Sequence, residues 1–266
     1  MKNLANYILE AKKQNLDIDR RQPKSRSELE MIISGAFKRK QYDLNFIDTS
    51  KITDMSELFE GVKHNFDVSS WDVSNVKDMS YMFTDCFKFN CDLSNWDVSN
   101  VTDMSHMFDS CSIFIGKGLE NWDVSNVTNM YSMFLHCKKF DCDLSNWDMS
   151  NVIDTSLMFS NCAKFTGKGI ENWNVSKVKS MYAMFGDCTN FNCDVSNWDV
   201  SNVTDMDSMF VNCKKFTGKG LENWNVSKVK TMRTMFNGCK FNYHELDWDL
   251  SGLSSQLKTF RNYLDD

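Results

Sequence analysis

The sequence predicts an α/β solenoid of about nine units, each 25 or 26 residues long, in which a short strand precedes a short helix. Tryptophan recurs at intervals of 24 to 26 residues, and the residues between the tryptophans repeat with few changes. The tryptophans are Trp71, Trp96, Trp122, Trp147, Trp173, Trp198, Trp224 and Trp248. Helix-capping residue types also recur at one position of every unit. Self-similarity at such a period is typical of solenoids, whose units stack on their neighbours.

Residues 1–42 are expected to form a helical N-terminal cap. A first helix is expected over residues 1–14, and its apolar face carries Leu4, Ile8 and Ala11. Ser27 and Glu30 have the spacing of a capping box, so a second helix is expected to begin at Ser27. Its apolar stripe consists of Leu29, Ile32, Ile33 and Phe37. This region would cover the first unit of the solenoid; a separate binding module is the alternative.

The repeats are expected over residues 43–253. In the first unit Ile47 stands where later units have tryptophan, and the last unit, which begins at Asp247, loses the Met-Phe pattern. Residues 254–266 are expected to form a C-terminal capping helix that carries Leu257, Phe260 and Leu264. Degenerate first and last units are typical of repeat arrays, whose ends must be covered.

One unit divides into a strand, a turn, a helix and a return loop. Apolar residues spaced LxxWxVxxV overlay the leucine-rich-repeat signature and predict a strand that joins a parallel sheet: Leu93, Trp96, Val98 and Val101. The expected helix N-caps are Asp54, Asp78, Asp103, Asn129, Asp154, Ser180, Asp205 and Thr231. The apolar face of the expected helix follows with the spacing i, i+3, i+4, i+7: Met104, Met107, Phe108 and Cys111.

The return loops alternate between two types. Loops such as FNCDLSNW end at Trp96, Trp147 and Trp198, whereas loops such as FIGKGLENW end at Trp122, Trp173 and Trp224. The true period is therefore a block of 51 residues. The two glycines in every second loop predict a turn with positive φ.

Composition and charge limit the function classes. The chain is 42% apolar and 13% aromatic with a single proline, which predicts an ordered protein. Its net charge of −6 divides into +5 for residues 1–40 and −11 for the remainder. An acidic array disfavours nucleic acid as a partner. No run approaches the roughly 18 apolar residues of a membrane span. No export signal is visible at the start, which favours a cytoplasmic protein.

The ten cysteines admit three interpretations. Seven follow the unit's Phe by three residues: Cys86, Cys111, Cys137, Cys162, Cys188, Cys213 and Cys239. Three more lie in alternate return loops: Cys91, Cys142 and Cys193. Disulfides or metal sites are conceivable. A ladder of reduced, buried residues is favoured, because the cysteines continue the apolar stripe and Val62 takes the same place in the first unit.

A row of carboxylates follows the tryptophans: Asp72, Asp97, Asp123, Asp148, Asp199 and Asp249, with Asn174 and Asn225 between them. Stacked carboxylates could bind calcium. Local hydrogen bonding is favoured, because asparagine keeps the shape without the charge. Where the row carries asparagine, a lysine stands three residues later, at Lys177 and Lys228. No metal or cofactor is expected.

The lysines between glycines and the four histidines do not predict a binding or catalytic site. The lysines between glycines, Lys117, Lys168 and Lys219, lack the frame of a phosphate-binding loop and are expected to be solvated turns. The histidines His64, His106, His136 and His244 occupy unrelated positions of different units. They define no catalytic or metal centre.

The repeated segment LSNWDVSNVTDMSHMF, together with PKSRSELEMII and DLNFIDTSKITDMSELF before it, resembles the BspA-like repeats of bacterial surface and adhesin-like proteins. The resemblance covers about residues 22–253. It implies a leucine-rich-repeat-like fold and a role in protein binding or adhesion at a cell surface, with no catalytic residues.

Repetition disfavours an enzyme, because a catalytic site needs a singular cluster and every candidate group here recurs in a row. We expect a monomeric, non-enzymatic protein that binds a protein or glycan partner over an extended face. A structural spacer or scaffold without a specific ligand is the alternative. A cluster of exposed aromatic residues on one face would favour the binding protein. Uniformly polar faces would favour the spacer. If the partner binds the expected helical side, the candidate partner-binding residues, which vary between units, are Tyr81, His106, Tyr131, Leu157, Tyr182, Asp207 and Arg233. If it binds the sheet side, it would contact the Asn, Asp and Ser rows.

Overall fold

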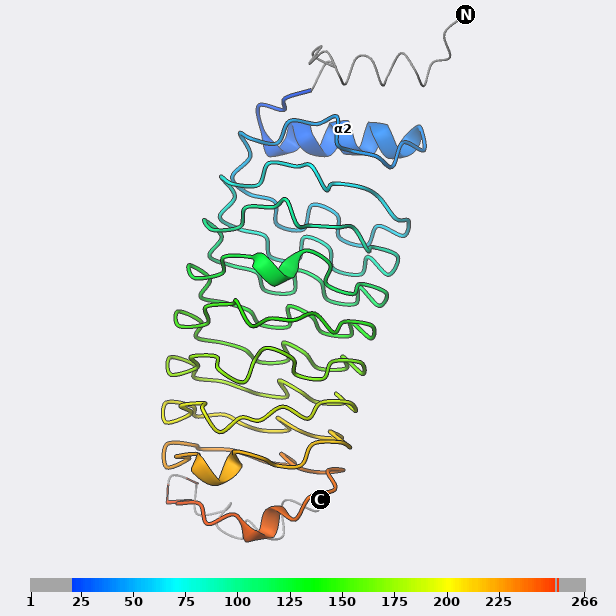
Figure 1. Cartoon of the computed structure of the whole chain (residues 1–266). Helices are drawn as coiled ribbons and strands as arrows, with labels where there is room; N and C mark the ends of the chain where they lie inside the picture. The colour runs from blue at the N-terminus through cyan, green and yellow to red at the C-terminus, as the bar shows by residue number, and fades with distance from the viewer. Residues whose placement is uncertain (1–20, 252, 254–266) are drawn as a thin grey trace, which may run out of the picture.

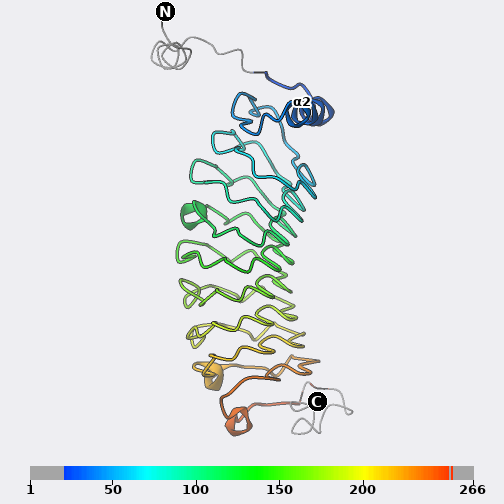
Figure 2. The same ribbon diagram turned by 90° about the vertical axis from the view of Figure 1, so that its right-hand side faces the viewer.

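The computed structural model describes residues 21–251 and 253, which form an elongated column of stacked loops (Figure 1). Each repeat unit makes one circuit, here called a rung and named by its tryptophan. Successive rungs lie side by side along the whole column, which is gently curved (Figure 2). The helices expected over 1–14 and 254–266 lie outside the described residues.

Helix α2 (Arg26–Lys38) lies across the end of the column formed by the first rung (Figure 1). Its N-cap is Ser25, so the start expected at Ser27 is wrong by two residues. Ser25 Oγ accepts a hydrogen bond from Glu28 N at 3.2 Å, and Glu28 Oε2 accepts one from Lys24 N at 2.7 Å. Both serines precede a glutamate by three residues. The earlier start places Arg26 in the first turn, where its guanidinium binds Asp54.

The repeats are not strand–helix units, and the predicted α/β leucine-rich-repeat-like class with its parallel sheet is wrong. Besides α2, the described residues contain only three short 3₁₀ turns: η1 (Leu119–Asn121), η2 (Leu221–Asn223) and η3 (Tyr243–Glu245). Neighbouring rungs are joined by isolated parallel bridges rather than by extended strands. The residues expected to cap helices form the main row of these bridges: Asp54, Asp78, Asp103, Asn129, Asp154, Ser180, Asp205 and Thr231.

The segment expected to be a helix is a succession of tight turns. Within the Trp71 rung, Met82 N donates to Met79 O, and Cys86 N donates to Phe83 O, each bond closing one turn. Alternate amides instead donate along the column: Tyr81 N bonds Ser105 O in the next rung at 2.9 Å. The backbone is thereby satisfied between rungs rather than along a helix axis.

Rung spacing explains why helices are absent from the repeats. The phenylalanine three residues before each cysteine, or before Val62 in the first rung, stacks on its equivalents in neighbouring rungs, from Phe59 to Phe236. The ring centroids along this row are 5.4–5.9 Å apart, and the planes differ by at most 12°. An α-helix with its side chains is roughly 10 Å wide. One helix per rung does not fit at this spacing.

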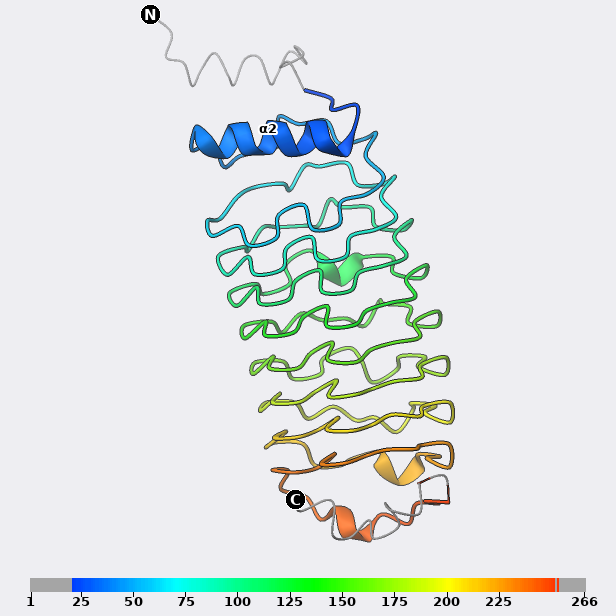
Figure 3. The same ribbon diagram turned by 180° about the vertical axis from the view of Figure 1, so that it is seen from behind.

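Rows of equivalent side chains fill the interior of the column. Figure 3 shows from behind the stacked backbone circuits that carry them. Every tryptophan indole from Trp71 to Trp248 donates its Nε1–H to a backbone carbonyl of the preceding rung, over 2.8–3.3 Å. Valine, methionine, phenylalanine and cysteine rows lie beside the indoles and are almost wholly buried. The residues predicted to face inward therefore do so, although the backbone that carries them differs from the predicted one.

Candidate binding face

All seven candidate partner-binding residues lie on one face of the column. We call it the ladder face; it consists of residues 77–86 of the Trp71 rung and the equivalent segments of the other rungs, which carry the bridges. The seven residues occupy two adjacent positions. Tyr81, His106 and Leu157 lie three residues after the bridge residue, with positive φ of 55–59°. Tyr131, Tyr182, Asp207 and Arg233 lie two residues after it.

Three of the seven form an aromatic cluster over three consecutive rungs. The rings of Tyr81 and His106 are nearly parallel, with centroids 4.4 Å apart and planes 13° from each other. The Tyr131 ring follows at 5.1 Å from His106 and is tilted by 58°. Tyr81 is 38% exposed, whereas His106 and Tyr131 are partly buried. The cluster offers aromatic faces and polar edges to a partner.

An acidic residue fixes the position of the His106 ring. His106 Nδ1 lies 3.1 Å from Asp109 Oδ2, and His136 Nδ1 of the next rung lies 3.8 Å from Asp109 Oδ1. His106 and His136, which occupy different positions of the repeat, thus lie beside one carboxylate. No group of three His, Cys, Asp or Glu side chains in the described part of the chain is arranged to hold a metal ion.

The other four candidates are spread over the later rungs. Tyr182 is 42% exposed and Arg233 is exposed, while Leu157 and Asp207 are partly buried. The Asp207 carboxylate accepts hydrogen bonds from Thr231 Oγ1 and from Arg233 N of the next rung. Asp207 therefore supports the ladder itself, and its carboxylate is less available to a partner than the Tyr182 ring.

The cysteines form the buried ladder that the sequence predicts. The seven that follow the Phe row donate their thiols to the carbonyl of the preceding rung's Phe, with Sγ–O distances of 2.9–3.1 Å. Burial raises the pKa of Cys86 to about 12 and that of Cys137 well above its usual value. Thiols held in this protonated state are weak nucleophiles and weak metal ligands.

The carboxylate row has the local role that the sequence favours. Each Asp or Asn after a tryptophan accepts a hydrogen bond from the backbone N–H of the serine two residues later, over 2.9–3.2 Å. Asn174 and Asn225 make the same turn as the aspartates. The charge of this row is therefore not needed for its structure.

The Gly-Lys-Gly loops carry solvent-exposed lysines, as expected, and they also connect neighbouring rungs. Lys117, Lys168 and Lys219 pair with Asp92, Asp143 and Asp194 of the preceding rung, at 2.7–3.0 Å. The Lys117 ammonium, followed by hydrogen bonds from Ser94, lowers the pKa of Asp92 to about 2. Gly118 has a φ of 93°, and any side chain there would collide with the Ser94 backbone. Each glycine loop thus fits only on an Asp-Leu/Val-Ser loop, which explains the 51-residue period.

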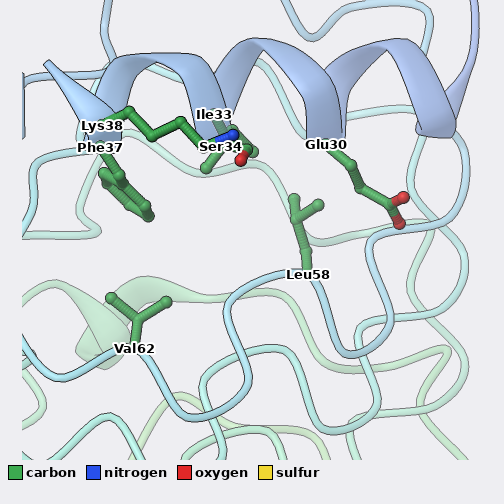
Figure 4. Close-up of a pocket in the computed structure, with 7 residues that line it drawn as sticks. All are labelled: Glu30, Ile33, Ser34, Phe37, Lys38, Leu58 and Val62. Atoms are coloured by element: carbon green, nitrogen blue, oxygen red, sulfur yellow. The ribbon is translucent and has the colours of Figure 1, made fainter.

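A shallow groove of about 450 Å³ lies between α2 and the first rung. Figure 4 shows Phe37 of α2 on one side of it and Leu58 and Val62 of the first rung on the other. Glu30 and Lys38 lie toward the two ends of the helix. The lining is continuous with the hydrophobic core, and the groove marks the junction of the cap with the repeats.

Stacked rungs with continuous side-chain rows and one aromatic-bearing ladder face define a solenoid repeat protein. The chain matches the model of the family described as Mycoplasma protein of unknown function, DUF285, at residues 27–118, 94–169 and 164–264, and it belongs to that family. No curated protein matches the chain. Within the described residues, no helix is long and apolar enough to cross a bilayer.

Proposed function

We propose that this chain is a non-enzymatic repeat protein that binds a protein or glycan partner on its ladder face. The observation that carries the proposal is the cluster of Tyr81, His106 and Tyr131. Clustered aromatic side chains on an otherwise polar surface mark interaction sites, because they supply large contact areas with little loss of conformational entropy. The resemblance to surface and adhesin-like repeats supports a partner at a cell surface.

The alternative is a spacer or scaffold without a specific ligand. Such a column would need only a soluble surface, to which a partly exposed aromatic cluster does not contribute. A catalytic role has less support, because the polar side chains are used in repeated contacts between rungs. Among the described residues, only His64 Nε2 and Ser132 Oγ are buried side-chain atoms without a hydrogen-bond partner.

The test compares two variants on arrays of glycans and of extracellular protein domains. The first variant is Tyr81→Ser, His106→Ser, Tyr131→Ser; serine occupies the same positions in other rungs, at Ser132, Ser208 and Ser105. The control is Phe87→Ser, which removes a 45% exposed ring outside the cluster and copies Ser112.

We expect the triple variant to lose at least about tenfold in affinity for partners of the unmodified chain, as hot-spot truncations do. The control variant is expected to keep them. Partners retained by the triple variant would contradict the assignment to the cluster. A chain without any reproducible partner on either array would favour the spacer.

A further inference from the structure

Two rungs near the C-terminal end of the column differ from the others in the charge of their outward side chains, on and beside the ladder face. The positions one, four, six and seven residues after the tryptophan point outward. In the Trp173 rung they hold Asn174, Lys177, Lys179 and Ser180, and in the Trp224 rung Asn225, Lys228, Lys230 and Thr231. Each set has a formal charge of +2. The same positions of the rung between them hold Asp199, Asn202, Thr204 and Asp205, with a charge of −2.

The fold does not require these charges. The asparagines make the turn that aspartates make elsewhere. Ser180 and Thr231 form the same parallel bridges as Asp154 and Asp205. All four positions change together in both rungs, and every change is toward positive charge. The bridges and turns persist, whereas the bond from the Asn202 amide to the Ser176 carbonyl has no equivalent at Lys177 and Lys228, which bond an asparagine side chain of the preceding rung instead. The backbone therefore accommodates either charge at these positions.

The four lysines of the two basic rungs are exposed to solvent. Lys177 Nζ donates to Asn151 Oδ1 at 2.7 Å and Lys228 Nζ to Asn202 Oδ1 at 2.8 Å, so each leans over the preceding rung. Lys179 and Lys230 are exposed, and their ammonium groups have no hydrogen-bond or ion-pair partner among the described residues. Arg233 is exposed in the same rung as Lys230 and adds a third cation there.

We infer that the outward side chains of the two basic rungs, together with the ladder face beside them, bind a linear acidic polysaccharide in which charged sugars alternate with neutral ones, the chain running along the column. The basic rungs are two rungs apart, ~10 Å at ~4.8 Å per rung. An acidic rung separates them. A sugar residue spans about one rung, so a charged sugar can meet each basic rung while a neutral sugar lies over the acidic one.

Other polyanions fit this charge pattern less well. A nucleic acid strand presents a phosphate about every 3.4 Å and would place charge on Asp199 and Asp205. An extended acidic peptide presents side chains on one face about every 6.6 Å, which does not match the ~10 Å between the two basic rungs. The aromatic rings of Tyr182, and of the cluster at Tyr81, His106 and Tyr131, lie on the same face and suit the apolar faces of sugar rings. This inference rests on the proposed binding function and specifies the partner.

The test measures binding of hyaluronan decasaccharides, in which glucuronate alternates with an uncharged amino sugar. Dextran serves as the neutral polymer, and heparin and single-stranded DNA serve as densely charged ones. The test variant is Lys177→Asn, Lys179→Thr, Lys228→Asn, Lys230→Thr, which copies the residues of the Trp198 rung. The control variant is Lys138→Thr, Lys139→Asn, Lys214→Thr, Lys215→Asn, which copies Thr189 and Asn190 and removes equal charge.

We expect salt-sensitive binding of hyaluronan, no binding of dextran, and a loss of at least about tenfold in the test variant only. The double variant Lys179→Thr, Lys230→Thr removes only unpartnered ammonium groups and serves if the quadruple variant fails to fold. Hyaluronan binding that is absent, equal in wild type and test variant, or reduced equally by the control would overturn the inference. So would preferential binding of heparin or DNA. If hyaluronan fails while array partners still depend on the aromatic cluster, the proposed function stands without this inference.

Discussion

Two backbone positions in each bridged rung are left-handed, three and seven residues after the bridge residue. The second of them shows a preference for particular residue types. Its φ values lie between 59° and 77° in Gly61, Asp85, Ser110, His136, Asn161, Asp187, Asn212 and Gly238. Left-handed backbone costs ordinary residues about 1–2 kcal/mol, whereas glycine adopts it freely and Asn and Asp tolerate it. Six of the eight residues belong to these three types. The left-handed backbone therefore favours Gly, Asn and Asp at this position, and Ser110 and His136 are the exceptions.

Asp85 offers a clean test of that requirement, because it is exposed and only its backbone bonds the next rung. Replacing it with glycine, as in Gly61 and Gly238, is expected to leave the free energy of unfolding within about 1 kcal/mol. Replacing it with valine is expected to cost about 1–2 kcal/mol. Chemical denaturation of the two variants measures both values, and a valine variant as stable as the glycine variant would contradict the conformational argument.

Burial of the thiols predicts slow chemistry and an alkaline limit to stability. Ten free thiols are expected, reacting slowly with Ellman's reagent in the native protein and at once in denaturant; two or more disulfides would contradict the buried ladder. Burial raises the pKa of Cys86 from 9.0 to about 12, so the unfolded chain loses protons first. The contribution of this thiol to stability is therefore fully present below pH 9 and declines as the pH rises toward 12.

At the scale of elements, α2 covers the apolar end of the column. It buries Leu29, Ile33 and Ala36 in the same core as the first rung. Arg26 fixes its orientation, with Nη1 2.9 Å from Asp54 Oδ1 and 2.7 Å from Ser56 Oγ. Beyond the end of the helix, His64 packs between Phe37 and Tyr42, at ring-centroid distances of 4.5 and 4.3 Å.

His64 is expected to make this junction sensitive to acid. Desolvation, followed by the charge of Lys88, lowers its pKa below 6.5, and its Nε2 is buried without a hydrogen-bond partner among the described residues. The unfolded chain therefore binds the extra proton first, and stability falls as the pH drops below about 6.5. The carboxylates with lowered pKa values lose their contribution only below about pH 3.8, a separate window.

The measurement is the free energy of unfolding between pH 7.5 and 5. The variant His64→Gln is expected to flatten the decline, because it cannot take up the proton. The variant His244→Gln, at the opposite end of the column, is expected to leave it unchanged. An equal decline in all three proteins would place the acid sensitivity elsewhere.

The repeat segments also show which features of the fold could be predicted from the sequence. The spacing of Met104, Met107, Phe108 and Cys111 identifies the inward residues, since both a helix and a row of tight turns place them on one side. The same spacing could not distinguish the two backbones. The Gly, Asn and Asp row seven residues after the bridge was the available signal against a helix, because an α-helix has no left-handed residue in its interior.

The candidate site was predictable only in part for a related reason. Tyr81, His106 and Tyr131 could be identified as variable positions outside the apolar stripe. Their stacking, and the meeting of His136 with Asp109, depend on neighbouring rungs placing different positions of the repeat side by side. That proximity follows from rung geometry, which the period alone does not specify.

At the scale of the whole molecule, stability is a sum over contacts between neighbouring rungs. Most rows continue through every rung, but the loops alternate, and Lys168 finds Asp143 only in the preceding rung. Gly169 likewise fits against Leu144 and Ser145, where a side chain would collide with the backbone. The smallest exchangeable piece of the column is therefore a pair of rungs.

Two internal deletions test this. Removing residues 122–172 takes out a 51-residue block and is expected to leave a cooperatively folding, shorter column. Removing residues 122–146 takes out 25 residues and brings two glycine loops together without Asp143. We expect the smaller deletion to be less stable than the larger one by about 2 kcal/mol or more, from the lost fit of the loops. Thermal unfolding ranks the two, and the reverse order would contradict the paired-rung unit.

The tryptophan row has an optical consequence. Five neighbouring pairs of indoles stack with centroids 6.3–6.5 Å apart and planes within 9° of parallel. At such separations excitation absorbed by one indole passes to the next much faster than it is emitted. The emission of the native protein should therefore report on a stretch of the column rather than on single residues. A quencher at one end would then reduce the fluorescence of tryptophans several rungs away. The quenched fraction would therefore measure how many rungs remain stacked.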